Sequence, residues 1–414
     1  MKSSNTEWLG DIPTEWDVAQ IGNYYELRNE KVSDYDFEPL SVTMKGIVPQ
    51  LATAAKSDDH SNRKLVKKGD FVINSRSDRR GSCGISPLDG SVSLINTVMK
   101  PRGEMNPQYY NWLFHTEQFA DEFYKWGHGI VDDLWTTRWQ EMKKIFIVAP
   151  PLSEQQTIAN YLDETCSKID EIVTEAKASI DEYKELKQAV IDNAVLHGLN
   201  NGIMKDSGND LIGKIPLFWE MRKLKYIADF NPGITIAYDV QKEVGYVPMN
   251  CVKNGYMNPL SAQLSDMSTG LTGFQDGDIV MAKVTPCFEN GNIAVAENLE
   301  QDVAFGSSEL FVIRTHSINR RFMLYYLQNS VFKNQCISTM TGTGGLKRVS
   351  GYFVNNAYIT YPPENEQQAI VNYLDEAVKN MDSLITEKES LIHDLEAYKK
   401  SLIYEVVTGK RKVV

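Results

Sequence analysis

One short stretch of the chain concentrates side chains that could bind phosphate or read the edges of bases. Residues 63–86 hold seven lysines and arginines against two aspartates, a local charge of +5. Arginine, serine and asparagine carry the hydrogen-bond donors that such contacts use. The candidate residues are Lys67, Lys68, Asn74, Arg76, Ser77, Arg79 and Arg80. A solvated charged loop is the alternative interpretation of this cluster.

Three further stretches offer similar donors. Residues 126–140 contain threonines and arginine, although two aspartates in the same stretch would repel phosphate. Residues 339–351 combine backbone-permissive glycines with two cations, which suits phosphate contact, but they lack the GxxxxGK[ST] pattern of a phosphate-binding loop. A flexible surface loop is the alternative there. The candidates from these stretches and from residues 283–290 are Thr137, Arg138, Lys283, Thr285, Asn290, Thr341, Thr343, Lys347, Arg348 and Ser350.

The candidate stretches are set among features that occur twice in the same order. Each half begins with Ile-Pro followed by Trp, continues with Gly-Asp and a β-rich run, then with a helical stretch that starts at Asn. It closes with a proline pair and a strip of which 12 of 21 residues are identical between the copies. The duplication predicts two related globular segments, each followed by a similar tail. The copies are 10–21 and 213–224, 69–74 and 277–282, 106–119 and 319–332, and 150–170 and 362–382.

Both tails are predicted to be long helices. The proline pair blocks a helix upstream, and Ser153 and Asn365 are the predicted N-caps. Apolar residues then recur at steps of three and four for over four heptads, interrupted by Lys187 in the first tail and by Lys388 and Lys399 in the second. A glycine closes each helix. The two seams bury each other most simply as an antiparallel pair; the alternative is two independent helices, each packed on its own domain.

These patterns predict an α+β fold with a pseudo-twofold internal repeat. Two globular domains of mixed α/β structure are separated by two long α-helices packed as an antiparallel coiled coil. The predicted division of the chain is 1–151 for the first domain, 152–198 for a central helix, 199–213 for a linker, 214–363 for the second domain and 364–414 for a C-terminal helix.

The net charge of −12, taken alone, argues against a nucleic-acid partner, but the distribution of that charge does not. Residues 154–197 and 364–409 each carry a charge of −6. Residues 1–153 carry −3 and residues 214–363 carry +1. The acidity is therefore concentrated in the predicted helices, and each globular segment can present a basic face.

Catalytic signatures are missing from the sequence. The string closest to the Asn-Pro-Pro-aromatic motif of methyltransferases is Asn231-Pro232-Gly233-Ile234, and no GxGxxG follows a strand. The five cysteines form no CxxC pair, and the six histidines are scattered. No stretch approaches the ~18 apolar residues of a membrane helix, and the N-terminal residues lack an apolar signal core. We therefore expect no intrinsic catalysis, no metal and a cytoplasmic location.

The repeated strip identifies a known family. Two variable segments alternate with two tails that open with P-P-x-x-E-Q-Q-x-x-I-x-x-Y-L-D, and residues 402–412 read LIYEVVTGKRK. This arrangement resembles the specificity subunit of Type I restriction–modification systems over nearly the whole chain. The resemblance implies that each globular domain is a target-recognition domain reading one half of a split DNA site, and that the candidate residues above contact double-stranded DNA.

The resemblance also implies partners. In that family the paired helices set the gap between the half-sites and dock two copies of the methyltransferase (modification) subunit, and a restriction subunit with helicase and nuclease activity joins them. The chain itself would hold no cofactor, because S-adenosylmethionine, ATP and Mg²⁺ belong to those partners. A physical argument agrees: two modules on a rigid spacer bind together only when the half-sites match the spacer. The alternative is a coiled-coil scaffold whose globular domains bind proteins.

Overall fold

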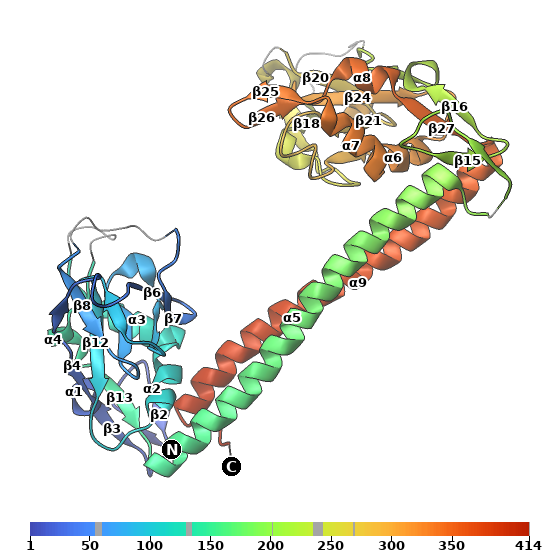
Figure 1. Ribbon diagram of the computed structural model, residues 1–414. Coiled ribbons are helices and arrows are strands. Elements are labelled where there is room, and N and C mark those ends of the chain that lie inside the picture. The colour runs from blue at the N-terminus through green and yellow to red at the C-terminus, as the bar shows by residue number, and fades with distance from the viewer. Residues whose placement is uncertain (54–59, 130–134, 201, 235–242, 268–269, 414) are drawn as a thin grey trace. The chain divides into compact units, whose positions relative to one another are not determined.

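The computed structural model describes residues 1–53, 60–129, 135–200, 202–234, 243–267 and 270–413. The chain divides into two compact units, which we call unit 1 and unit 2 (Figure 1). Unit 1 comprises Met1–Lys177 and Glu389–Val414, and unit 2 comprises Ala178–Lys388. Both combine β-sheets with helices, so the expected mixed α and β content is found. Within the described residues, no helix has the length and apolar character that crossing a bilayer requires.

Unit 1 contains a four-stranded antiparallel sheet in the order β10-β9-β12-β4 and a three-stranded sheet in the order β11-β8-β5. Shorter pairs are β1-β2, β13-β3 and β6-β7. The strands are β1 Lys2–Ser3, β2 Asp11–Ile12, β3 Asp17–Gln20, β4 Tyr25–Leu27, β5 Lys31–Val32, β6 Leu40–Thr43, β7 Gly46–Pro49, β8 Arg63–Val66, β9 Phe71–Asn74, β10 Cys83–Ile85, β11 Gly90–Val92, β12 Asn96–Pro101 and β13 Phe146–Ala149. The short helices are α1 Ile21–Tyr24, η1 Ser77–Arg79, α2 Pro107–Phe114, α3 Glu117–Lys125 and α4 Trp139–Met142.

Unit 2 contains two four-stranded sheets, in the orders β17-β24-β21-β22 and β19-β18-β23-β20, and the pairs β14-β15, β16-β27 and β25-β26. The strands are β14 Met204–Asp206, β15 Lys214–Pro216, β16 Glu220–Lys223, β17 Ala228–Phe230, β18 Glu243–Val247, β19 Leu260–Gln263, β20 Thr272–Gln275, β21 Ile279–Ala282, β22 Ile293–Val295, β23 Val303–Gly306, β24 Leu310–Thr315, β25 Thr341–Thr343, β26 Leu346–Arg348 and β27 Tyr358–Tyr361. The short helices are η3 Leu224–Tyr226, η4 Met249–Cys251, η5 Leu264–Asp266, η6 Glu300–Asp302, α6 Arg320–Gln328, α7 Ser330–Ser338 and α8 Gly351–Asn356.

The duplicated sequence produces the same sheet in both units. The order β10-β9-β12-β4 in unit 1 matches β22-β21-β24-β17 in unit 2. The Gly-Asp motif immediately precedes the second strand of each sheet, and its glycines adopt the same left-handed conformation, with φ of +92° at Gly69 and +93° at Gly277. A side chain at either position would be strained, which explains why glycine occurs in both copies.

The aspartate of each Gly-Asp motif forms a buried ion pair within its own unit. Arg28 donates to Asp70 from Nε and Nη2, at 2.5 and 3.0 Å. Arg314 donates to Asp278 in the same two-bond geometry, at 2.7 and 2.7 Å. Each carboxylate also accepts the backbone N–H three residues earlier. The motif therefore fixes the turn before the strand instead of reaching outward.

The helical stretch of each half is two short helices instead of one. Asn106 and Asn319 cap the first helix in each pair, as the sequence predicts, by accepting backbone N–H groups. Thr116 and Asn329 then cap a second helix, because their side-chain oxygens accept N–H groups at its first turn. These internal capping residues break each predicted helix in two.

The long helices are α5 (Leu152–His197) and α9 (Glu364–Val407). The predicted N-caps Ser153 and Asn365 are wrong, because both residues lie inside the first turn. The carbonyl of the second proline in each pair accepts the first helical hydrogen bonds, so the helix starts directly after it. The predicted ends are confirmed: left-handed glycines follow each helix, with φ of +79° at Gly198 and +71° at Gly409.

Segments of α5 and α9 pair in an antiparallel sense within each unit. In unit 1, Lys399 binds Asp170 at 2.6 Å and Lys177 binds Glu396 at 3.4 Å, so residue numbers rise along one helix as they fall along the other. The apolar residues of the predicted seam are buried or half-buried in both helices.

The lysines that interrupt the seam also find partners inside one unit. Lys399 uses Asp170 in unit 1, and in unit 2 Lys187 binds Asp382 at 2.6 Å. The Nζ atom of Lys388 lies 6.0 Å from the centre of the Tyr183 ring, also in unit 2. Each charged end thus has a partner beside the seam, and a long lysine side chain can keep its charge at the edge of an apolar contact.

Candidate nucleic-acid interface

In unit 1 the two candidate stretches are joined by a backbone bridge. The N–H of Ser77 donates to the carbonyl of Trp135 at 3.2 Å, and the N–H of Thr137 donates to the carbonyl of Ser75 at 3.0 Å. The segment after β9 therefore lies directly beside the segment before α4. The first two candidate loops of the sequence form one site.

The same bridge occurs at the corresponding residues of unit 2. The N–H of Thr285 donates to the carbonyl of Lys347 at 2.9 Å, and the N–H of Val349 donates to the carbonyl of Lys283 at 2.9 Å. These residues lie 208 and 212 positions after their unit 1 counterparts, the same offsets as the Gly-Asp motif and the repeated strip. Both units thus place their candidate side chains on one shared backbone frame. The sequence shows the repeat but not this long-range pairing.

Several cations of unit 1 are engaged by acidic neighbours. Lys67 binds Asp89 at 3.0 Å, and Arg80 forms an ion pair with Asp121. Arg79 is about two-thirds exposed and lies 3.6 Å from Asp78 of its own turn.

Two basic residues of the same stretch form hydrogen bonds within the sheets of unit 1 and do not point outward as free charges. Arg63 and Lys64 lie in β8, where burial lowers the pKa of each side chain. Arg63 donates to the hydroxyl of Ser91 at 2.8 Å, and Lys64 donates to the carbonyl of Asn96 at 2.6 Å. The outward-facing charge of residues 63–86 is therefore smaller than the sequence count of +5. Among the candidates, Lys68, Arg79, Arg80 and Arg138 are exposed and Arg76 is half-buried.

Three polar candidates are buried and support the frame. The Oδ1 atom of Asn74 accepts the N–H of Arg76 at 3.0 Å. The hydroxyl of Thr137 donates to the carbonyl of Phe123 at 2.8 Å. The hydroxyl of Thr285 donates to the carbonyl of Gly345 at 2.8 Å. These side chains hold the loops in place, and their hydrogen-bonding capacity is largely used within the protein.

The glycine-rich stretch of unit 2 is an ordered hairpin, β25-β26, in which every residue from 341 to 348 is exposed. Gly344 and Gly345 form its two-residue turn with φ of +65° and +82°, which residues other than glycine, asparagine or aspartate rarely adopt. Thr341, Thr343 and Lys347 lie on this hairpin. The hairpin also exposes about half of Leu346, an apolar residue that a pattern of polar donors does not indicate.

Three candidates of unit 2 lie outside the hairpin. Ser350 caps α8 by accepting the N–H of Phe353, and Asn290 is exposed in the turn after β21. The Nζ atom of Lys283 lies 5.6 Å from the centre of the Phe311 ring. The acidic pair expected to repel phosphate in unit 1, Asp132 and Asp133, lies outside the described residues.

The repeated strip, which the sequence singles out most strongly, binds the base of each long helix to its own globular part. We call this contact the joint. In unit 1 the carboxylate of Glu154 accepts the indole N–H of Trp16 at 2.8 Å. In unit 2 Glu366 accepts the indole N–H of Trp219. The Ile-Pro…Trp motif and the strip are therefore two halves of one contact.

The first glutamine of each strip is buried in the joint. In unit 1 Gln155 accepts the backbone N–H of Asn106 and donates to the carbonyl of Pro150, both at 2.8 Å. In unit 2 Gln367 accepts the N–H of Asn319 at 2.7 Å and donates to the carbonyl of Pro362 at 2.8 Å. One side chain thus connects the helix start to the cap of the neighbouring helix.

The aspartate of the Tyr-Leu-Asp segment completes each joint. Asp163 accepts from the Gln108 amide and the Trp112 indole at 2.9 and 2.8 Å.

In unit 2 the corresponding acceptor is Asp375. It accepts from Arg321 at 2.6 Å and from the hydroxyl of Tyr325 at 2.7 Å. These donors occupy positions equivalent to those in unit 1 but have different chemistry, so the anchoring geometry is kept while the partners vary.

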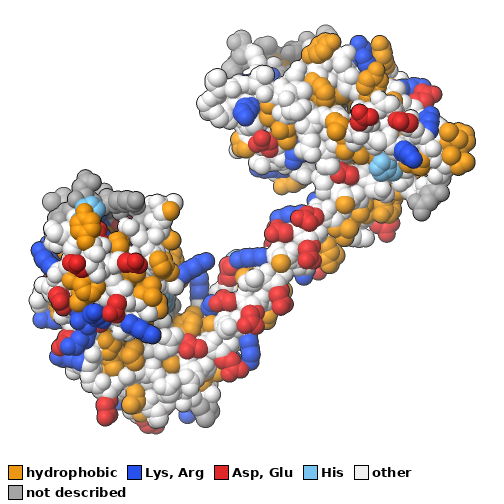
Figure 2. Space-filling view, viewed as in Figure 1, with side chains coloured by type: hydrophobic (Ala, Val, Ile, Leu, Met, Phe, Trp, Pro, Cys, Tyr) orange, Lys and Arg blue, Asp and Glu red, His pale blue; other side chains and the backbone are white. Residues whose placement is uncertain are grey.

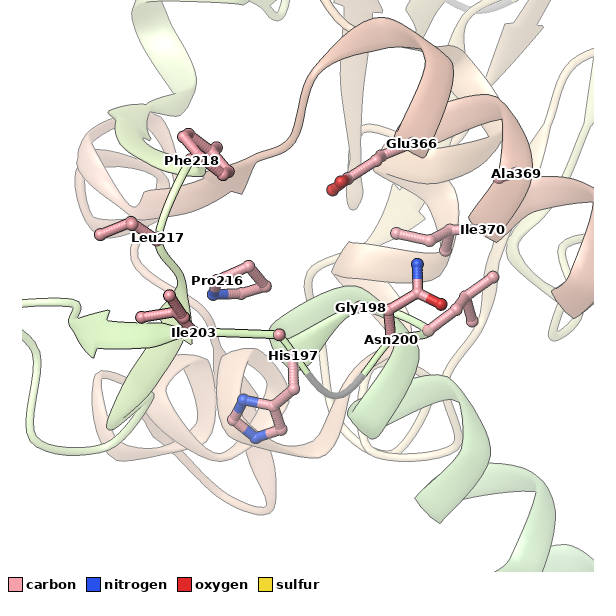
Figure 3. Close-up of a pocket in the computed structure, with 12 residues that line it drawn as sticks. His197, Gly198, Asn200, Ile203, Pro216, Leu217, Phe218, Glu366, Ala369 and Ile370 are labelled. Carbon is pink, nitrogen blue, oxygen red and sulfur yellow. The ribbon is translucent and has the colours of Figure 1, made fainter.

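Figure 3 shows a pocket of about 190 Å³ at the joint of unit 2. Glu366 points toward it from the start of α9, and Pro216, Phe218 and Ile370 supply apolar walls. Within the described residues, no group of three or more His, Cys, Asp or Glu side chains is arranged to hold a metal ion. Figure 2 shows acidic side chains, with fewer basic ones among them, along the visible face of the long helices.

The frame and joint describe a protein with two related, donor-rich modules, each anchored to a helix base. Comparison with known proteins shows what it is similar to. Residues 216–393 match the family described as Type I restriction modification DNA specificity domain. The chain is 23% identical over 428 residues to the Type I restriction enzyme MjaVIII specificity subunit of Methanocaldococcus jannaschii, covering 97% of this chain and 94% of that protein.

Two relatives match more closely over a shorter region. The Type I restriction enzyme EcoAI and EcoEI specificity subunits of Escherichia coli are each 34% identical over 183 residues, or 43% of this chain. The aligned region spans only 31% and 30% of the lengths of those two proteins. Residues 216–393 therefore belong to the Type I restriction modification DNA specificity domain family, and over almost its whole length the chain is similar to a Type I specificity subunit.

Solved structures share the fold. One, described under the assembly and conformational transition of the type I R-M system, superposes with a TM-score of 0.75 at 16% identity, covering 97% of this chain and all of that chain. The HsdS subunit from Thermoanaerobacter tengcongensis superposes with a TM-score of 0.57 at 17% identity, covering 97% and 98%.

Proposed function

We propose that this chain is the DNA-recognition subunit of a Type I restriction–modification complex. Each globular domain reads one half of an asymmetric, split site in double-stranded DNA. The observation that carries this proposal is the shared frame: the same backbone bridge supports different side chains at equivalent positions of the two units. Two readers with one scaffold and different surfaces suit a site whose halves differ.

The proposed domain division follows the repeat. Recognition domains at 1–151 and 214–363 are separated by helices at 152–198 and 364–414, with a linker at 199–213, and the helices form an antiparallel coiled coil that sets the gap between half-sites. The antiparallel ion pairs within each unit and the anchored helix bases support this layout. If the helices connect the two recognition domains rigidly, binding of the first domain to its half-site places the second domain over the other half-site. The second contact then forms only when the gap between the half-sites matches the helices.

The proposed partners are double-stranded DNA, two methyltransferase subunits and the restriction subunits, in the cytoplasm. Methyl transfer and cleavage belong to those partners, together with S-adenosylmethionine, ATP and Mg²⁺. The chain itself is proposed to contribute recognition and assembly without catalysis. The proposed DNA contacts are those candidate residues that the structure leaves exposed, with the buried ones acting as supports.

A domain exchange tests the proposal in the reconstituted complex. Residues 17–149 include both strands of the β13-β3 pair, so replacing this segment with that of another specificity subunit leaves the pairing intact. We expect sequencing of methylated DNA to show one altered half-site and one unchanged half-site. A change in both halves would refute the assignment of one domain to each half.

The alternative, a scaffold whose globular domains bind proteins, differs in its response to salt. Phosphate contacts release counterions, so DNA binding by the complex should weaken steeply as salt rises. Binding to cognate and scrambled duplexes is measured at several salt concentrations. A complex that binds neither duplex would support the scaffold, which the family relationship does not favour.

A further inference from the structure

We propose that Arg348 reads a guanine in the half-site of the second domain and that Glu309 holds its guanidinium in the reading orientation. The inference rests on the proposed function and adds to it a named base and a positioning residue. It comes from the geometry of one ion pair at the base of the β25-β26 hairpin, between the exposed Arg348 and the half-buried Glu309.

Glu309 fixes the Arg348 side chain through several hydrogen bonds. The Nε atom of Arg348 lies 3.1 and 2.9 Å from the two carboxylate oxygens, and Nη2 lies 2.7 Å from Oε1. This contact raises the pKa of Arg348 and lowers that of Glu309. A fork-to-carboxylate contact restricts the guanidinium to one plane, so less rotamer entropy is lost when it binds a second ligand.

The braced guanidinium still has donors to offer. Arginine carries five N–H groups, and the carboxylate uses those on Nε and on one side of Nη2. The Nη1 group and the outer hydrogen of Nη2 remain along the opposite edge. Two parallel donors match the O6 and N7 acceptors of guanine in the major groove, the commonest specific arginine contact with DNA.

The hairpin presents this edge outside the body of unit 2. Every residue from 341 to 348 is exposed, and a two-stranded ribbon fits the major groove. Arg348 pairs with Thr341 across the hairpin and shares a face with it, whereas Lys347 pairs with Gly342 and faces the other side. The bonds from Thr285 to the Gly345 and Lys347 carbonyls fix the angle of the ribbon.

A purely structural role explains the pair less well. Exposed ion pairs contribute little to stability, about 0–1 kcal/mol. The position equivalent to Arg348 in unit 1 is Thr136, 212 residues earlier, so the frame does not need an arginine there. The arginine is particular to the second domain, as expected for a residue that reads a particular base.

The test uses the reconstituted complex and its mapped DNA site. Each guanine of the second half-site is replaced in turn by 7-deazaguanine, which lacks the N7 acceptor. We expect wild-type binding to fall about 5- to 10-fold at one position, because one of two hydrogen bonds is lost. Arg348→Ala should weaken binding to the normal site about 10- to 100-fold and show no further loss at that position.

Glu309→Gln tests whether Glu309 acts by orienting the Arg348 guanidinium or by contacting the DNA itself. It keeps the shape and one acceptor, so we expect intermediate affinity and a smaller penalty at the same guanine. Arg222→Ala is the matched control: its guanidinium also pairs with an exposed carboxylate of unit 2, at 2.8 Å to Glu220, but lies on β16, outside the candidate stretches. The control should bind DNA like the wild type.

Two results would overturn the inference. One is a wild-type complex that discriminates the second half-site but is insensitive to 7-deazaguanine at every position. The other is an Arg348→Ala complex whose binding still falls about 5- to 10-fold when 7-deazaguanine replaces that guanine. If the wild-type complex does not discriminate the second half-site at all, the proposed function fails instead, so the two failures are distinct.

Discussion

Replacing Gln367 with alanine tests whether the repeated strip serves mainly as a joint. The Gln367 side chain is 3% exposed. It accepts the Asn319 N–H at 2.7 Å and donates to the Pro362 carbonyl at 2.8 Å. Alanine removes both partners and leaves two backbone groups without them in a space too tight for free hydration. Each such group costs about 1–3 kcal/mol, so the expected loss in the free energy of unfolding is ~2–6 kcal/mol.

The neighbouring glutamine supplies a matched control. Gln368 is exposed and bonds to the Asn319 amide at 3.1 Å and to Asn372 at 2.8 Å. Because water can replace these contacts, Gln368→Ala should cost under ~1 kcal/mol. Gln155→Ala should reproduce the large effect in unit 1, since its two bonds are both 2.8 Å.

Urea unfolding of the assembled complex and hydrogen exchange resolved by mass spectrometry provide the readouts. Exchange should speed up at the start of α9 and in α6 for Gln367→Ala, and at the start of α5 and in α2 for Gln155→Ala. Equal stability of the Gln367→Ala and Gln368→Ala chains would refute the joint. Hydrogen exchange that speeds up only in segments away from the substituted joint would also refute the role of the joint.

Three further changes probe other parts of the molecule. Burial lowers the pKa of His115 in the folded protein. As the pH falls below 6.5, the unfolded chain therefore binds more protons than the folded chain, and the free energy of unfolding decreases. His115→Gln should make this decrease smaller in urea titrations between pH 7 and 5. Asp278→Asn leaves Arg314 without its charged partner and should cost about 2–4 kcal/mol by thermal unfolding, whereas Glu220→Gln at an exposed pair should cost under ~1 kcal/mol. Gly345→Ala places a side chain at φ +82°, and we expect a loss of ~1–2 kcal/mol in local hairpin stability, seen as faster hydrogen exchange at residues 341–348.

The sequence was most informative where chemistry is local. Capping by Asn106 and Asn319, the terminal glycines and the helical seam depend on neighbours within a few residues, and all are found. The wrong N-caps have a local cause too: a proline carbonyl can start a helix as well as a serine side chain can cap one. Ser153 is therefore not needed as an N-cap, because the Pro151 carbonyl already accepts the first helical hydrogen bonds.

The candidate site could be predicted only in outline, because its geometry depends on long-range pairing. Loop composition pointed to residues 75–80 and 339–351, but not to the bridge that joins each loop to a second segment. Composition also overstated the free charge, since the acids that pair with Lys67 and Arg80 come from elsewhere in the chain. Asp89 and Asp121 carry no sequence signal of that role.

The joint changes where partner subunits are expected to bind. The resemblance implies that the paired helices dock the methyltransferase subunits, yet the glutamate, first glutamine and aspartate of the repeated strip form contacts inside each unit. A partner that docks twice must then contact other residues that recur at the 212-residue offset. Ile172 and Leu384 are such a pair: both are exposed apolar residues on long helices, about 45% and 39% exposed.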